Sequence, residues 1–411
     1  MHKGQIANVD LIKQVNSAAV YRLIDQQGPI SRVKIAELSQ LAPASVTKIT
    51  RQLLAHDLIK EVAQQASTGG RRAISLTTEK NKFHFVAAKI GRRLLTLTLY
   101  DLAGEEQAGL QLPIQVTEQQ ALIDLLTSTL EAFIDQYSHN NKRLLAIAVT
   151  MSGLINPQTG HVIYTPRYQM RDCPLGEYLT AYFNIPAYIG NDTRAMALAE
   201  HYFGNSQDCA DSILISVHHG TGSGIISRGQ VFLGSNRNVG EIGHIQIDPL
   251  GKPCHCGNYG CLETVASNDA IVEQVKTLLA AGRPSCLAEQ EINIASICQA
   301  ATQGDALASS VLVNVGKHLG QAIAIMVNLF NPEKVLLAGE IMAAEQVIIP
   351  AIEQCIKHQS LPSFHQHLPI IAAKFQKQPT AGGFALVKRV LLDGSLLQTI
   401  MEDKPTYHIN P

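Results

Sequence analysis

Four potential metal ligands lie close together in one glycine-rich stretch of the sequence, residues 240–264. His244, Cys254, Cys256 and Cys261 are separated by nine, one and four residues. Zinc binds such a set of three thiolates and one imidazole tetrahedrally, and four protein ligands leave no position for water. The spacing therefore predicts a structural Zn²⁺ that cross-links a loop, rather than a catalytic metal. The alternative is a set of ordinary buried cysteines beside a hydrogen-bonding histidine.

The rest of the chain favours a cytoplasmic protein with reduced thiols. The five other cysteines are scattered, without the spacing of a disulfide framework. No apolar stretch approaches the length of a membrane span, and the N-terminus lacks the apolar core of a signal peptide. With 411 residues, 46% of them hydrophobic, the chain is long enough for two or three domains with cores of their own.

Residues 1–80 have a charge balance and a helical pattern of their own. They contain 11 lysines and arginines against 6 aspartates and glutamates, whereas residues 81–411 contain 22 against 28. After a first segment with helical apolar spacing, Ser31 is a suitable N-cap for a short helix, and Pro43 is a suitable first residue for the next one. Two short helices joined by a tight turn predict a helix-turn-helix.

The second of these helices has the composition of a DNA recognition helix. Opposite its apolar face it carries the candidate DNA contacts Ser45, Thr47, Lys48 and Arg51. Two predicted strands follow, and the loop between them carries Arg71 and Arg72 at its tip, as in the wing of a winged helix. Together with the local positive charge, this predicts a winged helix-turn-helix DNA-binding domain over residues 1–80. A small helical packing module with a solvated hairpin is the alternative.

From about residue 83, predicted strands and helices are mixed. The segments FHFVAAKI and LLTLTLYD have the composition of paired strands, and LLAIAVTMSGLI that of a buried strand running into a glycine loop. A long helix, NVGKHLGQAIAIMVNLF, precedes another buried strand. This mixture predicts an α/β body of two lobes with a cleft, which we place at residues 81–195 and 196–411.

These stretches together resemble the ROK family (repressors, open reading frames, kinases) over essentially the whole chain. The zinc signature in HIQIDPLGKPCHCGNYGCLET carries the resemblance in the body. The segments NSAAVYRLID, QLAPASVTKITRQL and STGGRRAIS are similar to the repressor branch, the NagC/Mlc group. The resemblance implies an N-terminal winged helix-turn-helix followed by an actin-like, two-lobed α/β body with a structural zinc loop.

The resemblance also implies a sugar site. Matched to the family's motifs residue by residue, the effector-binding positions are Gly153, Asn191, Asp192, Glu241, His244 and Glu263. Acids and amides form bidentate hydrogen bonds with neighbouring hydroxyls, which fits a sugar ligand. In the family's kinases the matching aspartate is the catalytic base, so Asp192 would be a vestige of it here. From the residues alone, Asn191 and Asp192 would be interpreted as a helix cap.

The nucleotide half of a ROK kinase is altered in this sequence. Lys89, Arg92 and Arg93 stand where the kinases carry an Asp-x-Gly-Gly-Thr phosphate loop, and a lysine cannot hold Mg²⁺. Glu340 stands where they usually carry a second glycine. A second glycine loop, residues 219–224, is intact, and we expect its backbone amides to face an anion. We therefore predict a transcriptional repressor without enzymatic activity, with a sugar kinase carrying an accessory DNA-binding domain as the alternative.

The expected partners follow from this interpretation. Operator DNA requires a homo-oligomer, dimer or tetramer, because a twofold dimer contacts two half-sites. Positive charge at the altered phosphate loop favours a sugar-phosphate effector such as N-acetylglucosamine 6-phosphate. A free sugar, or the dephosphorylated B domain of a glucose phosphotransferase transporter, is the alternative gating partner, and the three basic residues would then form a solvated surface.

Overall fold

The structure is a computed structural model that describes residues 9–63, 74–137 and 143–402. It divides the chain into two compact units: unit 1 contains residues 1–190 and 383–411, and unit 2 contains residues 191–382. The boundary predicted from the sequence lies after residue 195, with the whole C-terminus in the second lobe. The difference arises because the C-terminal helices pack on the sheet of unit 1, as described below.

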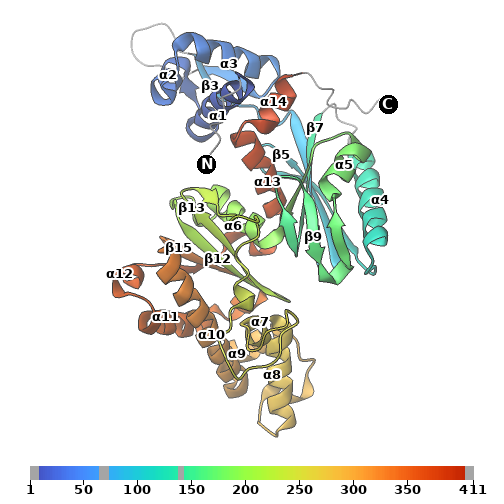
Figure 1. The fold of residues 1–411 in the computed structure, drawn as a ribbon, viewed down its shortest axis with the longest axis vertical. Coiled ribbons are helices and arrows are strands. Elements are labelled where there is room, and N and C mark those ends of the chain that lie inside the picture. Colours follow the sequence, from blue (N-terminus) through green and yellow to red (C-terminus); the bar gives the residue numbers. More distant parts are fainter. Residues whose placement is uncertain (1–8, 64–73, 138–142, 403–411) are drawn as a thin grey trace. The chain divides into compact units, whose positions relative to one another are not determined.

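Unit 1 begins with a small helical module that carries a three-stranded sheet (Figure 1). Its elements are α1 (Val9–Gln27), β1 (Ile30–Ser31), α2 (Arg32–Ser39), α3 (Pro43–Ala55), β2 (Ile59–Ala63) and β3 (Ile74–Thr78). The predicted helix starts are confirmed: Ser31 caps α2 by accepting from the Lys34 amide, and Pro43 is the first residue of α3. Val46, Ile49 and Leu53 are buried, so α3 packs by its apolar face.

The body of unit 1 is a mixed sheet in the order β11-β7-β4-β5-β6. Antiparallel strands β4, β5 and β6 form a meander, and β7 adds in parallel beside β4. Helices α4 and α5 lie beside this sheet (Figure 1). Apolar side chains of these two helices form the core together with those of β4, β5 and β7. The bounds are β4 (Phe83–Ile90), β5 (Leu94–Asp101), β6 (Glu106–Pro113), α4 (Gln119–Tyr137), β7 (Arg143–Met151), β8 (Leu154–Asn156), β9 (His161–Thr165), β10 (Met170–Cys173), α5 (Leu175–Phe183) and β11 (Ala187–Asn191).

The C-terminal helices α13 (Ala381–Leu392) and α14 (Ser395–Met401) complete unit 1. A Cβ placed on Gly383 would lie 2.8 Å from the Cβ of Ala87, so only glycine lets α13 approach β4 this closely. The next residue, Phe384, stacks on Phe85 and Tyr100. These contacts explain why the C-terminal segment belongs to unit 1 and not to the second lobe.

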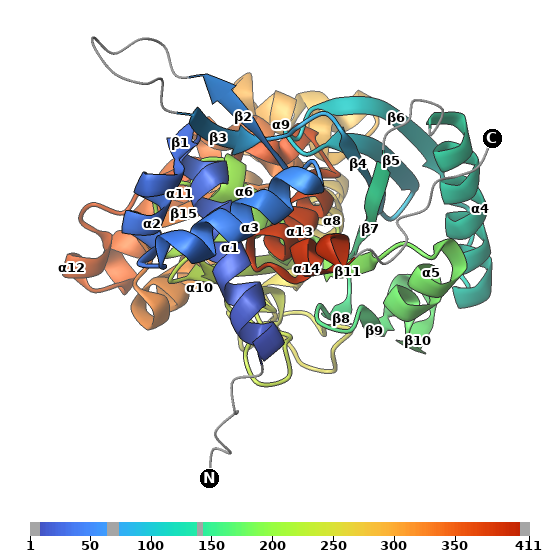
Figure 2. The ribbon, with the colours of Figure 1, turned by 90° about the horizontal axis from the view of Figure 1, so that it is seen from above.

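The same helices also hold the N-terminal module through α1, which lies beside α13 and α14 (Figure 2). Lys388 of α13 donates to Asp25 of α1, and the two side chains retain only 10% and 15% of their exposure. Arg22 donates to the backbone oxygen of Leu392 at 3.0 Å. A nearly buried ion pair therefore joins the first helix of the chain to one of the last.

Unit 2 repeats the strand arrangement of unit 1. Its sheet has the order β14-β13-β12-β15-β16, with an antiparallel β12-β13-β14 meander and parallel β15 and β16 on the other side. Helix α6 contacts β12 and β13, while α10 supplies more of the buried core residues than any other element. Helices α10 and α11 run side by side (Figure 1). The bounds are α6 (Asp192–Phe203), β12 (Ser212–Val217), β13 (Thr221–Ser227), β14 (Gln230–Val231), α7 (Glu263–Ala266), α8 (Asn268–Ala280), α9 (Ile294–Thr302), α10 (Ala306–Phe330), β15 (Lys334–Ala338), α11 (Glu345–Gln359), α12 (Pro362–His365) and β16 (Ile370–Ala372).

Helix α10 is the longest helix in the described part of the chain, with 25 residues. By length and composition it could cross a membrane, which corrects the expectation that no apolar stretch approaches that length. However, 61% of its most apolar window is buried inside unit 2. It packs against α11, α9 and α8, so its apolarity is explained by its place in the core.

We predict that Asp25→Ala lowers the free energy of unfolding by about 3 kcal/mol, because it leaves the ammonium of Lys388 nearly buried without its partner. The matched control is Asp10→Ala, which breaks an exposed pair with Lys13 on the same helix and should cost less than about 0.5 kcal/mol. Urea titrations of both variants measure the difference. Equal losses in the two variants would contradict the structural role of the Asp25–Lys388 pair.

Candidate functional site

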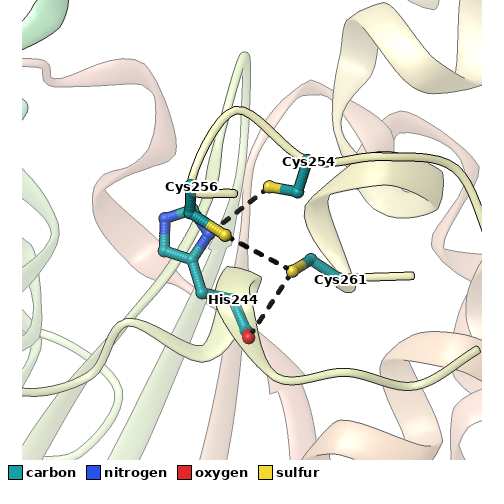
Figure 3. Close-up of side chains that lie close together, drawn as sticks. All are labelled: His244, Cys254, Cys256 and Cys261. Atoms are coloured by element: carbon teal, nitrogen blue, oxygen red, sulfur yellow. Dashed lines mark hydrogen bonds between the residues drawn. The ribbon is translucent and has the colours of Figure 1, made fainter. Parts of the chain in front are cut away.

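The four predicted metal ligands converge in one loop of unit 2 (Figure 3). One ligand atom from each of His244, Cys254, Cys256 and Cys261 lies within 4.8 Å of all the others. His244 ends a short 3₁₀ turn after Glu241, and Cys261 directly precedes the segment that enters α7. The backbone closes the loop, because the amide of Ile247 donates to the Gly260 oxygen and that of Leu262 to the Ile245 oxygen.

The distances between these atoms fit a tetrahedral zinc. Ligand bonds of zinc to sulfur and nitrogen place neighbouring ligand atoms about 3.5–3.8 Å apart. The Nδ1 of His244 lies 3.7 Å from the Sγ of Cys254, and the Sγ atoms of Cys256 and Cys261 lie 3.7 Å apart. Burial raises the pKa of the Cys261 thiol, and a bound metal would displace its proton. The donor set is compatible with structural Zn²⁺.

His255, which the sequence spacing leaves as a bystander between two ligands, has a contact of its own. Its Nδ1 lies 3.4 Å from the Oε1 of Glu263, and its ring lies edge-on to that of His244, with centroids 5.2 Å apart. The other carboxylate oxygen of Glu263 accepts a hydrogen bond from the Thr221 amide at 3.0 Å. Glu263 is therefore held between the metal loop and the start of β13, with 19% of its side chain exposed.

Glu241 and Asp192 share a buried neighbour that the sequence analysis did not identify, Arg194. The guanidinium donates to the backbone oxygen of Arg237 at 3.1 Å and to the side chain of Asn238 at 3.2 Å. Desolvation lowers the pKa of Arg194, while the carboxylates of Glu241 and Asp192 oppose this shift. For Glu241, desolvation raises the pKa and Arg194 lowers it. The pKa of Glu241 is raised on balance, so this buried cation offsets the burial of the Glu241 carboxylate only in part.

Asn191 is the helix cap that its sequence position also allowed. Its side-chain oxygen accepts from the Arg194 amide at 3.0 Å at the start of α6. Asp192 is the first residue of that helix, and its Oδ1 accepts from the Thr193 amide at 2.9 Å. Helix α6 follows β11 directly, without an intervening loop. The cap fixes both side chains at the amino end of a helix, and it is compatible with a sugar role for either one.

Gly153, the remaining predicted sugar position, belongs to unit 1 and lies in the turn between β7 and β8. Its φ is +130°, which favours glycine. A Cβ there would lie 2.6 Å from the backbone oxygen of Tyr164. The close approach of β9 therefore requires glycine at this position independently of any ligand.

The glycine loop at residues 219–224 differs from its predicted form. We expected amides open to an anion, but Thr221–Ser227 forms strand β13. The Thr221 amide donates to Glu263, and the Ser223 amide donates to the backbone oxygen of Gly240 at 2.8 Å. Gly222 and Gly224 lie in register with β12. The loop therefore holds Glu263 directly and Glu241 through its neighbour Gly240. Two of its backbone amides, those of Thr221 and Ser223, already donate hydrogen bonds within the protein.

The predicted DNA contacts lie on α3. Thr47, Lys48 and Arg51 are exposed and Ser45 is partly exposed. The Thr47 hydroxyl donates to the Pro43 oxygen at 2.8 Å, which leaves its lone pairs as acceptors. Arg71 and Arg72 lie outside the described residues.

Comparison with known proteins finds one family along most of this chain. The model of the ROK family matches residues 85–390. The chain is 53% identical over 401 residues to the DNA-binding transcriptional dual regulator NagC of Escherichia coli (strain K12), covering 98% of this chain and 99% of NagC. It is 38% identical over 402 residues to the DNA-binding transcriptional repressor Mlc of the same organism, covering 97% and 99%. A crystal structure of a ROK family transcriptional regulator, a homologue of the E. coli MLC protein, has a TM-score of 0.91 and 47% identity, covering 96% of this chain and 100% of that chain. The resemblance inferred from the motifs is confirmed.

We predict that Cys256→Ser loses the metal, because serine is a poor zinc ligand and the remaining three residues cannot close the tetrahedron. The matched control is Cys286→Ser, which removes an exposed cysteine of unit 2 outside the loop and should leave the metal content unchanged. Elemental analysis of the purified proteins should find one zinc per chain in the wild type and in the control only. One zinc per chain in Cys256→Ser, or none in the wild type, would contradict the site.

Proposed function

Because the chain belongs to the ROK family along most of its length, we propose that it is a DNA-binding transcriptional repressor of genes for sugar uptake and metabolism, and not a kinase. The observation that carries this proposal is the full-length similarity to DNA-binding regulators, which includes the N-terminal module. Lys89 occupies the position of the kinases' phosphate loop, where an acid would be needed to hold Mg²⁺. A regulator of this kind works in the cytoplasm, which also suits its free cysteines.

In this proposal the N-terminal module contacts operator DNA. Helix α3 enters the major groove with Ser45, Thr47, Lys48 and Arg51, and the hairpin between β2 and β3 carries Arg71 and Arg72 to the phosphates or the minor groove. In the described part of the chain, no acid pairs with Lys48 or Arg51, whereas Arg32 is bound to Glu61 and Thr50. A homo-oligomer, a dimer or tetramer, would present two such modules to the two halves of an operator.

The zinc loop and its neighbours hold the effector in this proposal. Zn²⁺ bound by Nδ1 of His244 would leave the other ring nitrogen to contact a sugar hydroxyl, while Glu241 and Glu263 accept from hydroxyls. Asn191, Asp192 and the Gly153 turn complete the set carried over from the family. Four-ligand zinc supplies no reactive water, so the site binds a sugar without transforming it.

The effector that suits this chain best is a 6-phosphosugar, with N-acetylglucosamine 6-phosphate as the first candidate. Since the amides of Thr221 and Ser223 are engaged, Lys89, Arg92 and Arg93 are the groups that would receive the phosphate. Lys89 is the second-last residue of β4 and is half-buried, and both arginines are exposed in the turn that follows this strand. The alternatives are a free sugar or the dephosphorylated B domain of a glucose phosphotransferase transporter.

We predict that Arg51→Ala weakens operator binding by about 1–3 kcal/mol, since it removes an exposed basic side chain of α3 that we propose contacts a guanine edge. Lys13→Ala removes the same charge from α1 and should have a smaller effect. Mobility-shift titrations with operator DNA at fixed salt compare the two. Unchanged affinity in Arg51→Ala would exclude this residue from the DNA contacts.

We predict that the wild type binds N-acetylglucosamine 6-phosphate more tightly than N-acetylglucosamine, and that the double variant Arg92→Ala/Arg93→Ala binds both equally, because it lacks the charges that receive the phosphate. Isothermal titration calorimetry with both ligands measures the difference. Arg283→Ala, an exposed arginine of unit 2, is the control and should keep the wild-type preference. Equal affinities in the wild type would contradict a phosphosugar effector and favour gating by the transporter domain.

A further inference from the structure

Two neighbouring strands of unit 2 bring His218 and Glu340 together across the sheet. Strands β12 and β15 are parallel and in register at Ser216 and Ala338, so their carboxyl ends meet at the same edge. His218 follows β12 directly, and only Gly339 separates Glu340 from β15. That glycine has φ +124°, and a Cβ on it would lie 1.9 Å from the Val217 oxygen. The close approach of Gly339 to Val217 therefore fixes the backbone position of Glu340.

Glu340 connects three separate segments through one carboxylate oxygen. Its Oε2 lies 2.6 Å from the Nδ1 of His218 and accepts a hydrogen bond from the Nδ2 of Asn268 at 2.8 Å. The Asn268 amide in turn donates to the His218 oxygen at 2.7 Å. Although desolvation raises it, these hydrogen bonds lower the pKa of Glu340 to about 2, so the carboxylate stays charged. We call His218, Asn268 and Glu340 the Glu340 clasp.

The exposure of the clasp argues against a role in stability alone. The side chains of His218 and Glu340 are 47% and 50% exposed, whereas Asn268 is buried. Ion pairs with this exposure contribute little to the free energy of unfolding. The clasp is therefore expected to restrain the position of its neighbours more than it stabilises the fold.

The clasp restrains the turn between β12 and β13, and this turn contacts the carboxylate of Glu263. Within the turn the His218 amide donates to the Gly220 oxygen at 2.9 Å. The next amide, that of Thr221, donates to the Oε2 of Glu263, and a Cβ on Gly220 would lie only 2.7 Å from that oxygen. A displacement of the turn would thus displace the Glu263 carboxylate.

We propose that Glu340 is a positioning residue of the effector site: by holding His218 and Asn268, it fixes the turn that orients Glu263, and so sets the affinity for the sugar without touching it. This inference rests on the proposed function, because it takes Glu263 as a sugar ligand. The family's kinases usually carry glycine at this position, and glycine has no side chain that could hold His218 and Asn268. The effect of Glu340 is on effector binding, and the DNA-binding module does not depend on it.

Calorimetry with N-acetylglucosamine 6-phosphate and N-acetylglucosamine tests the clasp in three variants. Glu340→Ala should weaken binding of the effector about 10-fold, the range found when a partner that orients a ligand-binding side chain is lost. Glu340→Gln, which can still accept from Asn268, should lose less. Asp269→Asn is the matched control, because it alters an exposed contact of the same turn, that of Asp269 with His219 at 3.1 Å. It should bind as the wild type does.

Two further measurements separate positioning from folding. The melting temperature and the effector-free operator affinity of Glu340→Ala should stay at wild-type values, while hydrogen exchange of the Thr221 amide should become faster. Effector affinity within twofold of wild type, or an unchanged exchange rate, would overturn the proposal, as would a loss of binding matched by a large fall in melting temperature. If the wild type bound neither sugar, the proposed sugar response would be wrong, and the exchange rate of Thr221 would still decide whether Glu340 restrains the turn.

Discussion

The metal loop of unit 2 depends on four side chains that point to one place, because it has almost no hydrophobic support of its own. Between Gln246 and Gly260, only Cys254 and Gly260 are buried. The core begins again at either side, with Ile242 and Leu262. A closed tetrahedral ion would provide the missing cross-link and would stabilise the loop in one conformation. The residues proposed to bind the sugar, Glu241 and Glu263, flank this loop directly.

Support for these carboxylates comes from several directions in the same unit. Arg194, near the start of α6, partly offsets the negative charges of Glu241 and Asp192. The Thr221 amide, at the start of β13, donates to Glu263. The Glu340 clasp reaches the same turn from the end of β15. Each of these groups acts at the carboxyl edge of the sheet or at a helix start, where side chains are held by backbone geometry. Such preorganisation suits a binding site that must discriminate between similar sugars.

Local patterns in the sequence predicted helices and strands well. The same patterns could not predict contacts between residues that are far apart in the chain. Strands β4 and β5 have the bounds of their predicted segments, since long runs of apolar and β-branched residues leave few alternatives. The four candidate metal ligands, which the structure brings together, were predicted from spacing alone. The pairing of His218 with Glu340 was not, because these residues are 122 positions apart and meet only through parallel strands. The amides of the glycine loop were misjudged for the same reason: their partners, Gly240 and Glu263, lie elsewhere in the chain.

We infer that a closed zinc holds the proposed effector site without taking part in chemistry. This inference can be tested by X-ray absorption spectroscopy at the zinc edge of the purified protein. We expect three sulfur ligands at about 2.3 Å and one nitrogen at about 2.0–2.1 Å, with the same spectrum before and after addition of the sugar, because the sugar would contact the far nitrogen of His244 and not the metal. An oxygen ligand from water, or one that enters the coordination shell with the sugar, would contradict the claim.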